Sequence, residues 1–390
     1  MEKDYDLSTR CVHAGEAGDG EGSPHTPIYN TTTFGFRSTA DLLDVVEGRR
    51  PGNLYTRYGL NPTIRSVEAK LATLENAESA LVFASGMAAE AALFFAHGRK
   101  GIVCVGNAYG GTLALLTDHL ALLGIPTTLL LGSEVGRVED ALKKGPGLVF
   151  FETPTNPTME IFDVREICRL AHSSGALVAV DNTFASPINQ QVLALGADIA
   201  VHSATMYLGG HSDLTGGALM GPKELIEPVA PWRKNLGQMM APEVAGLLSR
   251  SLRTLPIRVE RQNRTAQAVA EAMGNHPKVA RVLYPGLPDF PQHGLARSQM
   301  SGFGGMLTLE IKGSGEDSTK VIDALRLFII APSLGGPESL ATQPMTTTHH
   351  GLSPDERLNR GITDSMIRFS IGMEAPQDLI DDLNNALANA

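Results

Sequence analysis

Two segments combine groups that suit a phosphate. Ser85-Gly-Met begins a helical pattern directly after the apolar run 80–83. The free N–H groups and the dipole at the start of such a helix favour an anion. An ordinary N-cap explains the same residues equally well when they are taken alone. Ser203 and Thr205 follow another apolar run, so their hydroxyl groups could contact the same phosphate.

Asp181 and Tyr109 are suited to a flat, positively charged ring. Asp181 ends the apolar run 176–180, where an unpaired carboxylate would be costly, so we expect a cation beside it. A protonated pyridine nitrogen is one such cation. Tyr109 follows the apolar run 101–105 and could stack on the ring. A buried structural tyrosine is the alternative.

The elements between these residues follow the pattern of an α/β protein. Short apolar runs alternate with helical patterns, which is typical of a parallel sheet covered by helices on both faces. We predict strands at 80–83, 101–105, 126–131, 147–152, 176–181 and 198–202, and helices at 64–76, 86–97, 111–123, 137–144 and 163–173. Ligands bind beyond the carboxyl ends of the strands in such sheets. The polar residues at these ends are Ser85, Asn107, Glu152, Asp181 and Ser203.

The remaining segments predict an arm and a second domain. Residues 1–55 are rich in Gly, Pro and Thr and show little periodicity, so we expect an extended arm that packs on something else. Residues 56–245 form the large, ligand-binding domain in this interpretation, and residues 246–390 form a small α+β domain. For the C-terminal part we predict a long helix at 243–274, strands at 279–283, 305–311 and 367–371, and helices at 318–326 and 376–388.

Composition limits the class of protein. The 390 residues are 43% hydrophobic and carry a net charge of −10, so a large core can form and nucleic acid is not the expected partner. Three cysteines without CxxC spacing argue against a disulfide scaffold. The polar N-terminus does not resemble a signal peptide, and no apolar run approaches a membrane span. We therefore expect a cytoplasmic enzyme without a membrane partner.

Other ligand motifs are missing from the sequence. It has no GxGxxG between a strand and a helix and no Walker loop. The histidine pairs His349-His350 and His202/His211 have no acidic or cysteine partner at ligand spacing. We expect ordinary hydrogen-bonded histidines here and no metal.

Longer segments of the chain resemble one enzyme family. The main match is Asp181-Asn-Thr-Phe-Ala-Ser-Pro followed by His202-Ser-Ala-Thr-Met-Tyr-Leu-Gly-Gly-His-Ser-Asp. Further matches are Val12-His-Ala-Gly, Pro27-Ile-Tyr, Tyr55-Thr-Arg, Asn61-Pro-Thr, Ala84-Ser-Gly-Met-Ala, Glu152-Thr-Pro-Thr-Asn-Pro, Ser333-Leu-Gly-Gly-Pro-Glu-Ser-Leu and Arg368-Phe-Ser-Ile-Gly. Together they resemble the Cys/Met-metabolism enzymes that depend on pyridoxal 5′-phosphate (PLP). These include cystathionine γ-synthases, cystathionine γ- and β-lyases, methionine γ-lyases and O-acylhomoserine sulfhydrylases.

This resemblance implies a fold and a set of binding residues. The fold is the type I PLP-dependent transferase fold, with a mostly parallel seven-stranded sheet in the large domain and a small α+β C-terminal domain. Tyr109 would stack on the ring and act as an acid, and Asp181 would pair with the ring nitrogen. The other residues implied at the cofactor are Ser85, Gly86, Met87, Asn156, Thr183, Ser203 and Thr205. Arg368, Ser333 and Glu338 would bind the amino acid substrate.

The resemblance also implies assembly. Tyr55 and Arg57 would reach the cofactor phosphate of a neighbouring subunit. The active unit would then be a homodimer, usually doubled to a homotetramer.

One residue departs from the family pattern. The family has a lysine in Ser-x-Thr-Lys that forms the Schiff base with PLP and shuttles protons, and this chain has Met206 there. Methionine has no amine, so it can perform neither task. A deliberate Lys→Met replacement and a natural homologue that kept binding but lost its chemistry both explain this residue.

The implied activity is γ-elimination or γ-replacement on an amino acid derived from homoserine or homocysteine. Tyr109-Gly-Gly111-Thr resembles the cystathionine enzymes, because many methionine γ-lyases carry Cys at the position of Gly111. Glu338 resembles γ-lyases and γ-synthases, whereas sulfhydrylases often have a basic residue there. The segment Gln343-Pro-Met-Thr-Thr-Thr-His-His fits no subgroup cleanly. Met206 predicts an inactivated form of such an enzyme. The alternatives are a non-catalytic homologue that binds PLP and amino acids, and an O-acylhomoserine sulfhydrylase.

Overall fold

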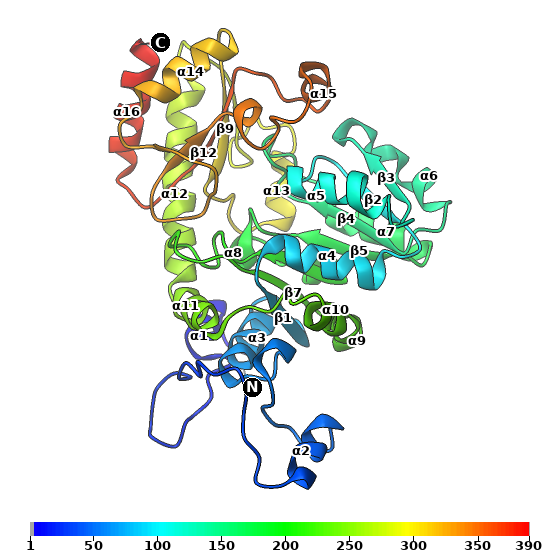
Figure 1. The fold of residues 1–390 in the computed structure, drawn as a ribbon. Coiled ribbons are helices and arrows are strands. Elements are labelled where there is room, and N and C mark those ends of the chain that lie inside the picture. Colours follow the sequence, from blue (N-terminus) through cyan, green and yellow to red (C-terminus); the bar gives the residue numbers. More distant parts are fainter. Residues whose placement is uncertain (1–3, 390) are drawn as a thin grey trace.

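A seven-stranded sheet forms the centre of the large domain (Figure 1). A computed structural model describes residues 4–389. The strand order is β1 (Ser79–Phe83), β7 (Gly217–Gly221), β6 (Ile199–Ser203), β5 (Leu177–Asp181), β4 (Leu148–Glu152), β2 (Ile102–Val105) and β3 (Thr127–Leu130). The strands from β6 to β3 are parallel, and β7 runs antiparallel to both of its neighbours. The predicted mostly parallel sheet is confirmed.

Strand β7 was not among the six strands predicted from apolar runs. Its sequence, Gly-Ala-Leu-Met-Gly, is short and begins and ends with glycine, so it reads as part of a loop. At Gly217 the backbone of β7 lies against the backbone of Ser85. Only glycine fits there, because a Cβ would lie 2.1 Å from the carbonyl oxygen of Ser85. The missing strand therefore packs directly on the predicted phosphate segment.

Helices cover both faces of this sheet (Figure 1). They are α3 (Pro62–Leu74), α4 (Gly86–His97), α5 (Gly110–Ala114) with a π-helical continuation (Leu115–Leu120), α6 (Val138–Leu142), α7 (Val164–Ser173), α8 (Ser186–Asn189), α9 (Lys223–Ile226) and α10 (Ala230–Asn235). Alternate residues of β4 enter two different cores: Val149 and Phe151 pack on one face, and Leu148 and Phe150 pack on the other. This explains why the strands read as continuous apolar runs.

The predicted single helix at 243–274 is wrong. Two helices occupy this stretch, α11 (Pro242–Leu252) and α12 (Leu255–Gly274). Pro256 lies in the first turn of α12, where its missing N–H is tolerated. In the interior of one continuous helix the same residue would break the hydrogen-bond ladder.

The C-terminal part has its own five-stranded sheet, which confirms the expected α+β character. Its order is β10 (Ile329–Ile330), β11 (Leu340–Thr342), β12 (Met366–Ser370), β9 (Met306–Ile311) and β8 (Val279–Leu283). Helices α13 (His293–Gln299), α14 (Gly315–Ala324), α15 (Pro354–Asn359) and α16 (Pro376–Asn389) accompany it. The short strands β10 and β11 and the helices α13 and α15 were not predicted.

The arm contains two short helices, α1 (Leu7–His13) and α2 (Thr39–Val46), where an extended segment was expected. Helix α1 packs against α3 and α12. The buried ammonium of Lys70 anchors it by donating to the carbonyl oxygens of Cys11 (2.9 Å) and Val12 (3.2 Å). The loop that follows and α2 extend away from the rest of the chain (Figure 1). Residues 1–3 lie outside the described part, and the boundaries at 55 and 245 stay predictions.

No helix in residues 4–389 combines the length and the apolar character that crossing a membrane requires.

Candidate active site

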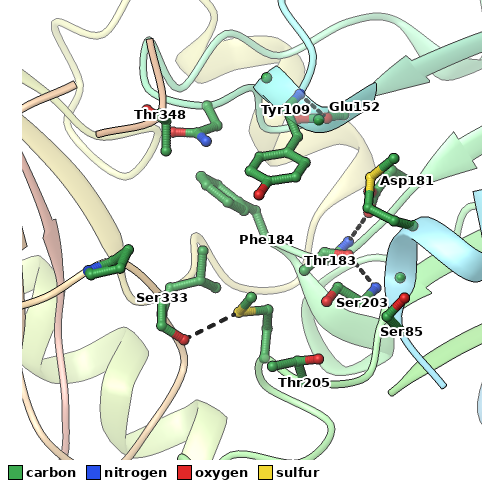
Figure 2. Close-up of a pocket in the computed structure, with 18 of the residues that line it drawn as sticks. Ser85, Tyr109, Glu152, Asp181, Thr183, Phe184, Ser203, Thr205, Ser333 and Thr348 are labelled. Atoms are coloured by element: carbon green, nitrogen blue, oxygen red, sulfur yellow. Dashed lines mark hydrogen bonds between the residues drawn. The ribbon is translucent and has the colours of Figure 1, made fainter. Parts of the chain in front are cut away.

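A cavity of about 550 Å³ lies beyond the carboxyl ends of the large-domain strands. It brings together most of the predicted site residues, and Figure 2 shows many of them pointing into it. The predicted residues that line it are Ser85, Gly86, Met87, Tyr109, Asn156, Asp181, Thr183, Ser203, Thr205, Met206, Ser333 and Arg368. Its volume suits a small organic ligand.

One end of the cavity is built as an anion site. Ser85 caps α4, and its hydroxyl oxygen accepts the backbone N–H of Ala88 at 3.1 Å. The N–H groups of Gly86 and Met87, at the start of the helix, have no partner within it, and both residues line the cavity. A Cβ on Gly86 would lie 2.9 Å from the Cβ of Ser203, so glycine lets the start of α4 approach β6. This end of the cavity fits a phosphate.

Asp181 forms no ion pair among the described residues, and the nearby basic group, His202, pairs with Glu75. Its Oδ1 accepts the backbone N–H of Thr183 at 2.8 Å, and the Thr183 hydroxyl oxygen accepts the N–H of Ser203 at 2.8 Å (Figure 2). Burial raises the pKa of Asp181 above its ordinary value, while the hydrogen bonds from Thr183 oppose that shift. A bound cation would therefore stabilise this group, and a protonated ring nitrogen meets that requirement.

The ring of Tyr109 is accessible from the cavity. Tyr109 is 46% exposed, and its backbone N–H donates to Glu152, the last residue of β4 (Figure 2). The alternative of a buried structural tyrosine is therefore wrong. Gly111 leaves room for this ring, because a Cβ there would lie 2.7 Å from its Cε1 atom.

Arg368 supplies a cation at the opposite wall. It is only 3% exposed, and its guanidinium donates to Asn156 Oδ1 (3.2 Å) and to the carbonyl oxygen of Ser333 (3.0 Å). Its Nε is buried without a hydrogen-bond partner. Burial lowers the pKa of Arg368 to about 10, so it stays charged at neutral pH. An unsatisfied buried guanidinium is suited to the carboxylate of an amino acid.

Met206 lies in the cavity wall, at the position where the resemblance implies a lysine. Its sulfur accepts a hydrogen bond from the Ser333 hydroxyl at 3.6 Å (Figure 2). No lysine is among the described residues that line the cavity.

Four predicted residues lie outside the cavity lining, namely Tyr55, Arg57, Glu338 and Asn107. Arg57 stacks against Tyr55 and Tyr58, with its guanidinium carbon 5.7 and 5.1 Å from their ring centres. Glu338 accepts a hydrogen bond from the Ser212 hydroxyl. Asn107, the fourth, contacts Arg360.

Several cavity residues were not predicted. They are Glu90, Gly110, Gly111, Pro154, Phe184, Thr215, Pro332, Leu334, Thr347 and Thr348, whereas Glu152 was predicted as a strand-end residue of the site and does line the cavity. Glu90 had a signal, since it follows Met87 by three positions, which puts both on one helix face. It is also the only charged residue in the otherwise apolar stretch Gly86–Phe95.

The geometry agrees with what comparison of the whole chain shows. The family model of Cys/Met metabolism PLP-dependent enzymes matches residues 8–388. The chain therefore belongs to this family of PLP-dependent enzymes of methionine and cysteine metabolism.

Individual relatives support the same assignment. The chain is 41% identical over 382 residues to a chloroplastic cystathionine γ-synthase of Arabidopsis thaliana, covering 96% of this chain and 68% of that protein. It is 38% identical over 391 residues to the L-methionine γ-lyase of Pseudomonas deceptionensis, covering 99% and 98%. The crystal structure of cystathionine γ-synthase from Xanthomonas oryzae pv. oryzae matches with a TM-score of 0.92 at 35% identity, over 99% of this chain and 98% of that one. The type I fold and the PLP cofactor are thus confirmed.

Proposed function

We propose that this protein binds PLP together with an amino acid derived from homoserine or homocysteine, as an enzyme of γ-elimination or γ-replacement whose turnover is lost or strongly reduced by Met206. The observation that carries the proposal is one cavity with an anion site at the start of α4, the free carboxylate of Asp181, and the unsatisfied guanidinium of Arg368. These groups match the phosphate, the ring nitrogen and the substrate carboxylate.

The cavity residues fit the cofactor in specific roles. The N–H groups of Gly86 and Met87 and the hydroxyl groups of Ser203 and Thr205 would hold the phosphate. Asp181 would pair with the ring nitrogen. Tyr109 would lie along one face of the ring, where its exposed side chain has room.

The bound cofactor supplies an electron sink for the pair of electrons that is left when a substrate C–H bond breaks. The protein contributes orientation and exclusion of water. Arg368 would fix the α-carboxylate and thereby turn the amino acid toward the ring. Tyr109 is the side chain with an O–H group on this side of the cavity that we assign to proton transfer toward a leaving group.

The second proton carrier of the family, the lysine, is absent because Met206 occupies its position. A thioether has no proton to donate, and its weak acceptor capacity is already used by Ser333. Losing a general acid–base costs about 10²–10⁴-fold in rate, and this chain lacks the covalent attachment of the cofactor as well. We therefore expect retained binding with little turnover.

Gly111 favours a cystathionine-type reaction over methionine γ-lyase chemistry. A side chain at this position would collide with Tyr109 and would come within 3.2 Å of the Met87 sulfur. A cysteine, which many methionine γ-lyases have there, would require Tyr109 to move. The ring position of Tyr109 is therefore matched to glycine.

Assembly is part of the proposal. Tyr55 and Arg57 lie at the end of the arm and outside the cavity of their own chain. We assign them to the phosphate site of a second copy, which requires a homodimer, with a homotetramer as the larger form.

The experiment is Met206→Lys, with Met206→Leu as the matched control. Both proteins are loaded with PLP and offered cystathionine, methionine, homocysteine and O-acylhomoserines, the last with cysteine or sulfide as the nucleophile, and keto acids, thioethers and thiols are measured. We expect turnover only in the lysine variant.

An inactive Met206→Lys protein that binds PLP normally would contradict the proposed reaction. It would favour the second candidate, a homologue that binds PLP and amino acids without catalysis, for which the lysine-free cavity is the supporting observation. Products from O-acylhomoserines and sulfide alone would favour a sulfhydrylase.

A further inference from the structure

A third carboxyl group lies at the end of the cavity where the ring nitrogen is expected. Glu90 is on α4 after Gly86 and Met87, is 4% exposed, and lines the same cavity as Asp181 and Glu152. Its Oε2 accepts the hydroxyl of Thr112 at 2.6 Å.

Glu90 has no ionic partner among the described residues. The side chains on the neighbouring elements that act on its charge are themselves acidic, with Asp181 at the end of β5 and Glu152 at the end of β4. Burial and the nearby Glu152 and Glu90 raise the pKa of the Cys104 thiol on β2, so this thiol stays neutral beside them. A buried carboxylate among acidic neighbours is unfavourable.

The basic groups on elements that pack against α4 are already used. On α10, Arg233 pairs with Glu68, and the ammonium of Lys234 lies 4.2 Å from the ring centre of Tyr58. On β6, His202 pairs with Glu75. Among the other neighbours of α4, strands β1 and β7 and helix α5 contain no titratable residue. The 3-10 helix Glu227–Val229 carries only Glu227, which is exposed and pairs with Lys223. Burial and the charge of Asp181 accordingly raise the pKa of Glu90 to about 8. The apoprotein therefore holds a proton on Glu90 at neutral pH.

We propose that Glu90 is a positioning residue that gives up its proton to solvent when the protonated ring of PLP binds beside Asp181, so that two carboxylates surround the ring nitrogen. This inference rests on the proposed orientation of the cofactor. The bound cation favours the ionised form of both carboxyl groups, because each attracts it. Thr112 supports the ionised form by donating its hydroxyl hydrogen to Glu90.

The consequence is a characteristic pH dependence of PLP binding. Glutamine has the shape of a protonated glutamic acid but cannot ionise. In Glu90→Gln, affinity should come nearest to that of the unchanged protein at the low end of the range, near pH 6, where Glu90 is most fully protonated. As the pH rises toward 9, only the unchanged protein gains the second carboxylate, so the ratio of the two dissociation constants should rise about tenfold for each unit by which the ring lowers the pKa of Glu90.

The test measures PLP binding by equilibrium dialysis between pH 6 and pH 9. Glu160→Gln is the matched control, since Glu160 is a half-buried glutamate outside the cavity lining, and its ratio should stay flat. Calorimetry in buffers of different ionisation enthalpy adds a second readout. The unchanged protein should release up to about one more proton per site than Glu90→Gln. A constant ratio across the pH range, or equal proton release, overturns the inference.

Two further variants keep the outcomes distinct. Thr112→Val removes the hydroxyl that favours ionised Glu90. The pH at which PLP affinity rises should therefore be higher in Thr112→Val than in the unchanged protein, and this comparison does not depend on the folding of Glu90→Gln. Asp181→Asn tests the cofactor orientation itself. If Asp181→Asn leaves PLP binding unchanged, the proposed function fails. If it weakens binding while the Glu90 variants show no pH dependence, only this inference fails.

Discussion

The hydroxyl of Ser333 donates to the sulfur of Met206 across 3.6 Å, and the carbonyl oxygen of the same serine accepts from Arg368 at 3.0 Å. Ser333 thus connects the position of the missing lysine to the proposed carboxylate clamp. It does so with a backbone φ of 109°, a left-handed conformation that a serine rarely adopts. These two contacts fit Met206 into the cavity wall. The following predictions therefore start from the protein with methionine at this position.

The first prediction concerns attachment of the cofactor at Met206. Borohydride treatment of the PLP-loaded protein should leave no pyridoxyl group on the chain, because no amine is present in the cavity wall to form the bond that borohydride reduces. Intact mass spectrometry measures this. Met206→Lys should gain one reducible cofactor per chain, whereas a labelled Met206 chain would mean that another lysine reaches the site.

Arg368→Ala should weaken substrate binding and leave the cofactor in place. Removing a buried charge that pairs with a carboxylate costs enough to raise the dissociation constant of the amino acid about 100-fold or more. Spectral titration of the PLP-loaded protein with candidate amino acids measures it. Arg281→Ala, at an exposed ion pair with Glu310, is the control. Loss of PLP from the Arg368 variant would contradict the assignment of this residue as a substrate clamp.

Gly86→Ala should damage the phosphate end of the cavity. The added methyl group would lie 2.9 Å from the Cβ of Ser203 and 3.1 Å from its Cα, and the backbone cannot yield freely there. Overpacking of this kind costs about 1–3 kcal/mol, which predicts PLP binding weaker by about tenfold to a hundredfold. Gly294→Ala in α13 is the matched control, because nothing lies within 4 Å of its added Cβ. Unchanged PLP affinity in Gly86→Ala would argue that the phosphate binds elsewhere.

Hybrid dimers test the role of Arg57. In the Met206→Lys background, an Arg57→Ala subunit and an Arg368→Ala subunit are each expected to be inactive alone. When they are mixed under conditions that exchange subunits, one of the two sites in each hybrid should contain both arginines, so that activity returns. If exchange is demonstrated and no mixture recovers activity, Arg57 does not complete a neighbour's site.

Glu90 should lower the stability of the apoprotein as the pH rises from 5 to 8. Its pKa is raised from 4.5 to about 8 in the folded state. Between these values the folded chain holds a proton that the unfolded chain has released, so raising the pH favours unfolding. Urea denaturation at pH 5, 6.5 and 8 gives the free energy of unfolding at each pH. The slope of this free energy against pH should be less negative for Glu90→Gln than for the unchanged protein. Identical slopes would mean that Glu90 is already ionised in the apoprotein.

Local patterns predicted the half of the site that lies on the large sheet. Continuous apolar runs located β1 to β6, and the polar residues that follow them, such as Ser85 and Asp181, do line the cavity. Patterns could not locate β7, because two glycines hide its strand character. They also could not bring Arg368 to the cavity, because that depends on how a second sheet packs against the first. Only the resemblance to the family implied it.

The placement of β7 between β1 and β6 also has a consequence for biosynthesis. A ribosome delivers Ser85 and the start of α4 long before Gly217, against which Ser85 packs. Until β7 emerges, β1 has no strand beside it and β6 has an open edge, and unpaired strand edges invite association with other chains. The phosphate segment therefore reaches its final packing only after β7 has been made. A chain that stops before Gly217 would lack this packing and would expose two unpaired strand edges, so premature termination should yield aggregates instead of a smaller working protein.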